Sequence, residues 1–115
     1  MKAYTNGKQS KILADILPLE SADMYYAYDI PYAIPYKNGI GSEKPCWSLA
    51  ALLDVIPKHI KDYNILRIDI SDNDFAIWYD EVGFGVNNDL PDITADNEVD
   101  ACVDMIVKLH ELNLL

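Results

Sequence analysis

The spacing of apolar residues along the chain predicts helices in three segments. In residues 8–17 the apolar positions recur every three or four residues, which is the helical period, and Pro18 follows as a stop. Thr5 or Asn6 is the expected cap of this helix. Residues 45–57, PCWSLAALLDVIP, are apolar on nearly every side, so we expect a buried helix at the centre of the fold.

The third helix has the clearest pattern and is predicted from about Asp96 to Leu112. Thr94 or Asp96 is the expected cap, and acidic residues crowd the first turn, where the helix dipole favours them. The face expected to be buried holds Val99, Cys102, Val103, Ile106, Leu109 and His110.

A period of two predicts strands between these helices. Residues 22–30 alternate in this way, and residues 64–70 and 75–80 flank the turn sequence SDND, so they are expected to form an antiparallel hairpin. Residues 83–86 are a candidate third strand. In the second hairpin strand, Phe75, Ile77 and Tyr79 are expected on one face and Ala76 and Trp78 on the other.

Elements of both kinds, without a repeated strand–helix alternation, predict an α+β fold: a small antiparallel sheet of hairpins packed against about three helices. At 115 residues, half of them hydrophobic, the chain is expected to be one domain over residues 1–115 with an independent core. No apolar run approaches the ~20 residues that cross a bilayer. The first residues lack the apolar stretch of a secretory signal, so we expect a cytoplasmic protein.

A window rich in tyrosine follows the first helix. Five of the eight tyrosines lie between Tyr25 and Tyr36, and two prolines, Pro31 and Pro35, interrupt the alternation there. Because proline has no backbone donor, residues 32–36 are expected to form an edge strand or an extended arm, whereas the residues before Pro31 belong to the sheet. Either the tyrosines fill the core, or the second half of the window is a protein interface. The candidate interface residues are Tyr25, Tyr32, Ile34 and Tyr36.

The charge of the chain is unevenly distributed, with a formal net value of −10. Residues 1–61 hold seven lysines and six acidic residues, whereas residues 62–115 hold two basic and thirteen acidic residues. Such a field repels phosphate backbones and anionic membrane surfaces, so we expect neither nucleic acid nor a membrane as a partner. The acidic half either docks on a basic protein or is only a soluble surface.

The residues that could carry chemistry form no recognisable motif. Cys46, Cys102, His59 and His110 are zinc-ligand types, but no two of them have the two-to-five-residue spacing of a ligand pair, so no metal site is predicted. Cys46 near the start of a helix, approached by a histidine, is the best enzymatic arrangement that the sequence offers. Without a supporting motif we expect no catalytic residue, no cofactor and two reduced thiols.

Three segments carry a resemblance: SADMYY, PCWSLAALLDVIP and the closing DACVDMIVKLHELNLL. Together with the strand hairpin between them, they resemble a family of uncharacterised small proteins of gut anaerobic bacteria and their phages or mobile elements. The resemblance implies an intracellular accessory protein and no mechanism.

Three hypotheses for function follow. The first is a non-enzymatic interaction module that uses the tyrosine arm to bind a protein partner or a second copy of itself. The second is an acidic decoy that occupies a basic, nucleic-acid-binding protein, and the third is a cysteine-dependent enzyme.

Overall fold

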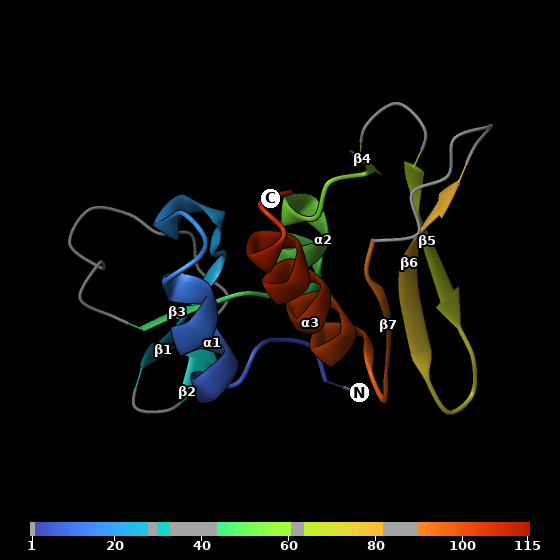
Figure 1. Cartoon of the computed structure of the whole chain (residues 1–115). Helices are drawn as coiled ribbons and strands as arrows, with labels where there is room; N and C mark the ends of the chain where they lie inside the picture. The colour runs from blue at the N-terminus through green and yellow to red at the C-terminus, as the bar shows by residue number, and fades with distance from the viewer. Residues whose placement is uncertain (1, 28–29, 33–43, 61–63, 82–89) are drawn as a thin grey trace.

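The structure is a computed structural model that describes residues 2–27, 30–32, 44–60, 64–81 and 90–115 (Figure 1). Its elements, in chain order, are α1 (Gly7–Ala14), a short 3-10 helix η1 (Leu19–Ser21), β1 (Met24–Ala27), β2 (Ile30–Tyr32), β3 (Lys44–Cys46), α2 (Leu49–Val55), β4 (His59–Ile60), β5 (Asn64–Ile70), β6 (Phe75–Glu81), β7 (Asp92–Ala95) and α3 (Glu98–Glu111). The strands form two antiparallel sheets, which confirms the predicted α+β class.

The smaller sheet has the order β2-β1-β3, with both pairs antiparallel. The single strand predicted over residues 22–30 is wrong, because β1 ends at Ala27 and Ile30 already belongs to β2. Contrary to the prediction, the sheet does not stop before Pro31, because Pro31 lies inside β2, in register with Tyr26. Tyr32 lies in the same strand, so the edge strand, one of the two forms expected for residues 32–36, is confirmed for Tyr32. A proline is tolerated there because β2 is at an edge in this strand order, where a missing donor breaks no ladder on the outer side.

The larger sheet has the order β4-β5-β6-β7 and contains the hairpin predicted at residues 64–70 and 75–80. Phe75, Ile77 and Tyr79, which were expected to share one face of this strand, are all buried. Strand β7 pairs antiparallel with β6 on its other side, and the sequence pattern gave no prediction of a strand there. The candidate strand at residues 83–86 lies outside the described residues.

Helix α3 occupies the centre of the molecule and packs against α1, α2, β6 and β7 (Figure 1). Because it is enclosed on several sides, it buries more than the single face that was expected, and His110, expected on that face, is exposed. The buried residues of α3 are Val99, Ala101, Cys102, Val103, Met105, Ile106 and Leu109.

We expected residues 45–57 to form the most buried helix, and this prediction was wrong. The segment begins in strand β3, and only seven residues of it, Leu49–Val55, are helical. Of these, Ala51 and Leu52 are buried, whereas Leu53 is only partly covered. A helix of two turns packs against fewer neighbours than the fourteen-residue α3 does.

Asparagine side chains cap the first and last helices. Asn6 caps α1 through a reciprocal capping box and is one of the two residues expected there. The cap of α3 is Asn97, whose side chain accepts a hydrogen bond from the N–H of Asp100 at 2.9 Å. Thr94 and Asp96, which were expected to cap it, precede the true cap, because β7 continues to residue 95.

One cluster of buried side chains joins the three helices to the larger sheet. It includes Leu13 of α1, Leu52 of α2, Ile77 of β6 and Leu109 of α3, each fully buried. The molecule is elongated, with extents of 49 × 31 × 19 Å. Because the helices and the larger sheet share this core, they form a single unit.

Candidate functional site

The four predicted interface residues fall in different places. Tyr25 lies in β1 and is partly buried, in register with Tyr32 of β2 on one side and with Pro45 of β3 on the other. The structure therefore places Tyr25 and Tyr32 on neighbouring strands. Ile34 and Tyr36 lie outside the described residues, so the arm that they were expected to form stays a prediction.

Tyr26 has a structural role at the junction of the small sheet and the N-terminal segment. Its hydroxyl donates a hydrogen bond to the carbonyl of Thr5. Burial, together with the neighbouring Cys46, raises the pKa of Tyr26 to about 12. Tyr26 is therefore a neutral donor that holds two segments together, as a tyrosine at the border of a core commonly is.

Cys46 is enclosed in a small buried network and not in a cleft. The Thr5 hydroxyl lies 2.7 Å from that of Ser10, accepts the Trp47 backbone N–H at 3.1 Å, and lies 3.6 Å from the Cys46 Sγ. Burial raises the pKa of Cys46, and this effect outweighs the opposing hydrogen bond from Thr5. Since Cys46 ends β3 and lies three residues before α2, the helix N-terminus expected to activate it is not at the thiol.

The remaining groups proposed for catalysis or metal binding are also apart. Cys102 is buried in α3, where burial and the nearby Glu98 raise its pKa to about 12. His59 and His110 are exposed, on β4 and α3. Two surface hollows, of about 720 and 540 Å³, are lined by no cysteine or histidine among the described residues. In the same part of the chain no three His, Cys, Asp or Glu residues are placed to hold a metal ion.

The most distinctive surface lies on the larger sheet, in the part of β5 that extends beyond its two-residue neighbour β4. Among the described strands, β4 pairs with β5 at Asn64 and Ile65, and the last bond on this side is the Leu66 N–H donating to the Lys58 carbonyl at 2.9 Å. Backbone groups alternate in direction along a strand, so Ile68 and Ile70 point their N–H and C=O to the same side as Leu66. We call this part of β5, residues 67–70, the open edge.

The core-facing side chains at the open edge are apolar and poorly covered. Ile68 and Ile70 are in register with Ile77 and Phe75 of β6 and so lie on the core-facing side of the sheet. Ile77 and Phe75 are 0% and 3% exposed, whereas Ile68 and Ile70 are 41% and 67% exposed. The register that buries two residues of β6 thus leaves their partners on β5 in solvent.

The reach of α3 explains this difference. A helix is about 10 Å wide and neighbouring strands are about 4.8 Å apart, so one helix covers about two strands. In this fold the two strands that α3 covers are β6 and β7, and β5 lies on the far side of β6 from the helix (Figure 1).

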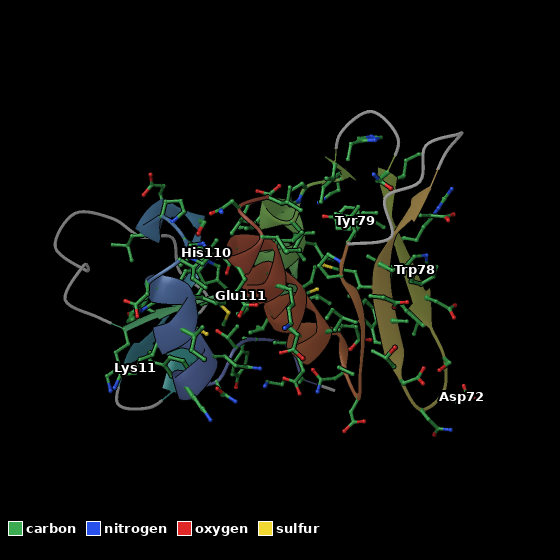
Figure 2. The ribbon with its side chains drawn as sticks, viewed as in Figure 1. Lys11, Asp72, Trp78, Tyr79, His110 and Glu111 are labelled. Atoms are coloured by element: carbon green, nitrogen blue, oxygen red, sulfur yellow. The ribbon has the colours of Figure 1, made fainter. Side chains whose placement is uncertain are left out.

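The charges around the open edge are mostly negative. Arg67 and Asp69 share the outer side of β5, and the turn that follows carries Asp72 and Asp74. The Arg67 Nε lies 3.4 Å from an oxygen of Asp80, so the one cation among these residues already faces a carboxylate. Figure 2 shows Asp72 at the tip of this hairpin, at the opposite end of the molecule from Lys11.

Sequence reasoning predicted the strand but not its exposure. The alternation Leu66, Ile68, Ile70 is the same as that of a fully buried strand face. What leaves it open is the shortness of β4 and the position of α3, and both are properties of the tertiary arrangement. The feature of the sequence that could have indicated this surface is the apolar alternation of residues 66–70 beside an acidic turn.

Comparison with known protein families, with curated proteins and with solved structures finds no match to this chain. Among the described residues, no helix has the length and apolar character needed to span a membrane.

Proposed function

We propose that the chain is a non-enzymatic protein-interaction module, which recognises a partner by accepting an extended segment of it as an added strand at the open edge of β5. The observation that carries this proposal is that Ile68 and Ile70 are exposed on a stretch of β5 that pairs with no other described strand on the side away from β6. Strand addition uses both features, since main-chain hydrogen bonds supply affinity and alternate side chains supply selectivity.

The free energy gained by covering exposed isoleucines favours the binding of a partner at the open edge. A fully buried isoleucine contributes about 1.5–3 kcal/mol relative to an exposed one, and here Ile68 and Ile70 are 41% and 67% exposed. Exposed apolar edges are sites of unwanted pairing, so proteins usually shorten, charge or cover them. At this edge the charged side chains Arg67 and Asp69 are on the outer side of the sheet and leave the isoleucine side uncharged.

Two further observations support this class of function. The free, buried thiols of Cys46 and Cys102 suit a reducing cytoplasmic setting. The net charge of −10 favours a protein partner over nucleic acid. The tyrosine arm predicted over residues 32–36 is a second candidate surface for the same function, because Tyr32 lies in β2, an edge of the smaller sheet.

Peptide display tests the proposal. A random library of ten-residue peptides is selected on the immobilised chain and then compared on the variant Ile68→Pro. Proline removes the N–H of residue 68, which points away from β6, and leaves the β5–β6 ladder in place. Selected peptides should bind the wild-type chain and lose most of their affinity for the variant.

Two controls accompany the selection. Circular dichroism and thermal melting establish whether Ile68→Pro is folded. If it is not, the comparison uses Ile68→Lys, which keeps the backbone donor and replaces the apolar side chain by a charged one. The proposal is wrong if the selected peptides bind the wild type and both folded variants equally, because the open edge would then not be their site.

A further inference from the structure

We infer that the strand accepted by β5 comes from a basic partner, in a segment whose apolar side chains alternate with lysine or arginine. This inference rests on the proposed strand addition and specifies the chemistry of the partner. It follows from the two sides of β5, which differ in character.

The core-facing side sets the apolar half of the pattern. A strand added at the open edge places every second side chain on the same side of the sheet as Ile68 and Ile70, within about 4.5–5.5 Å between Cβ atoms for directly opposite residues. Apolar side chains at these positions would cover the two isoleucines, which α3 does not reach. The intervening residues of the partner then point to the outer side.

The outer side sets the charged half. It presents Asp69, with Asp72 and Asp74 in the adjoining turn, whereas Arg67 is already beside Asp80. Opposite charges on facing strands stabilise a pair, and like charges directly opposite destabilise it. The field of the whole C-terminal half, which holds two basic and thirteen acidic residues, adds to the attraction for a basic segment.

A second copy of this chain fits the same edge poorly. In an antiparallel pair centred on Ile68, Ile70 of the second copy would fall beside Leu66, where the Lys58 carbonyl is already bonded. The register that avoids this clash and still pairs the isoleucines of both copies sets Ile68 opposite Ile70 of the second copy, and it places the two copies of Asp69 directly opposite each other. Two chains of charge −10 also repel at long range.

The test uses synthetic peptides on the full chain. The probe is a ten-residue peptide that alternates lysine and valine, with blocked ends. Its matched controls are the same peptide with glutamate for lysine, and a block peptide of five lysines followed by five valines. Binding is measured by titration, and amide hydrogen exchange identifies the residues that become protected.

We expect the lysine–valine peptide to bind and to slow the exchange of the Ile68 and Ile70 amides. The glutamate peptide should bind at least about tenfold more weakly, and the block peptide should give no protection at these two residues. The double variant Asp69→Asn, Asp72→Asn should lower the affinity about three- to tenfold. A control with the same change of charge, Asp15→Asn with Glu20→Gln in the N-terminal part of the chain, should change it less than about twofold.

Three results would overturn the inference. Equal or tighter binding of the glutamate peptide, with Ile68 and Ile70 protected, would show strand addition without the basic preference. Light scattering that found a dimer lost in Ile68→Pro would identify a second copy as the occupant. If no alternating peptide protected these amides and the display selection also gave nothing specific to the edge, the proposed function would fail together with the inference.

Discussion

At the scale of single residues, Thr5 shows how a short polar side chain joins distant segments. It is fully buried, and its hydroxyl accepts the Trp47 N–H while it pairs with Ser10 of α1. Its own N–H donates to the Trp47 carbonyl at 3.0 Å. The sequence suggested Thr5 only as a helix cap, and its actual role depends on β3, more than forty positions away.

Replacing Thr5 by valine should destabilise the chain by about 1–3 kcal/mol, because the Trp47 N–H would lose a buried acceptor at nearly constant side-chain volume. Urea denaturation followed by tryptophan fluorescence measures this loss. Thr94→Val, at an exposed position of β7, is the control and should change stability little. Equal effects of the two substitutions would contradict the role given to Thr5.

Asp100 joins the N-terminus to the start of α3. Its carboxylate accepts hydrogen bonds from Lys2 at 2.7 Å, Gln9 at 2.8 Å and Asn97 at 2.8 Å. Partial burial alone would raise its pKa, but these three donors and the charge of Lys2 hold the pKa of Asp100 below its usual value. One helical turn later, burial, followed by the charge of Asp100, raises the pKa of Asp104, although Lys108 opposes this.

The two carboxylates should therefore have opposite effects on stability. A lowered folded-state pKa means that ionised Asp100 stabilises the fold above its unfolded-state pKa, and that this contribution is lost as the pH falls through the folded value. Asp100→Asn should thus be less stable than wild type at pH 7, with the difference shrinking at low pH. Asp104→Asn should be more stable at pH 7, and this gain should also shrink toward low pH. Urea denaturation between pH 3 and 7 measures both, and a pH-independent difference would contradict the assignment.

At the scale of elements, the helix at the centre of the core is not the one that was expected there. The apolar run of residues 45–57 gave the stronger signal for a central helix, but α3 has that place. Leu109 and Leu52 are both fully buried, whereas Leu53 is partly exposed.

Leu109→Ala and Leu52→Ala should each cost about 2–5 kcal/mol in stability, the range for a leucine removed from a packed core. Leu53→Ala should cost clearly less, since less surface is buried there. Thermal and urea unfolding of the three variants would show the order. A Leu53→Ala variant as unstable as the other two would contradict the described burial of α2.

The sequence predicted the type of most elements and missed their limits for identifiable reasons. The hairpin β5–β6 and helix α3 were predicted because long periodic segments determine their own structure. The small sheet was misjudged because Tyr26, Tyr28 and Ile30 continue one alternation across the end of β1, so the pattern gave no sign of a new strand at Ile30. A two-residue strand such as β4 has too few positions to show any period.

The candidate site shows the same limit in another form. The residues of the open edge were read correctly as a strand, but the exposure of Ile68 and Ile70 depends on how far α3 reaches across the sheet. The pattern of residues within one strand does not determine how far a helix from another part of the chain extends across the sheet. The interface was predicted in the tyrosine window instead, because the prolines that interrupt its alternation can be recognised in the sequence itself.

At the scale of the whole molecule, charge and shape act together. Lys11 lies toward one end and Asp72 at the other end of a molecule that is 49 Å long (Figure 2). The net charge of −10 should keep copies apart at neutral pH, even though each has an apolar open edge.

Lowering the pH toward the isoelectric point of about 4.3 should therefore allow association through that edge. Light scattering should show single chains at neutral pH and moderate salt, and larger species near the isoelectric point. The double variant Ile68→Ser, Ile70→Ser has the same charge and should associate less under the acidic condition. If it associates as readily as wild type, some other surface brings the copies together.

The central position of α3 has a consequence for synthesis on the ribosome. Every element that α3 contacts precedes it in the chain, so the earlier elements emerge before the helix that completes their core. Until α3 follows, apolar residues of the shared core such as Leu13, Leu52 and Ile77 lack the neighbours that α3 contributes to it. The salt bridge between Lys2 and Asp100 likewise forms only after Asp100, 98 positions later in the chain, has been made. The segments that precede α3 should thus remain open to chaperones until α3 has emerged, and the shared core should fold in one step after that.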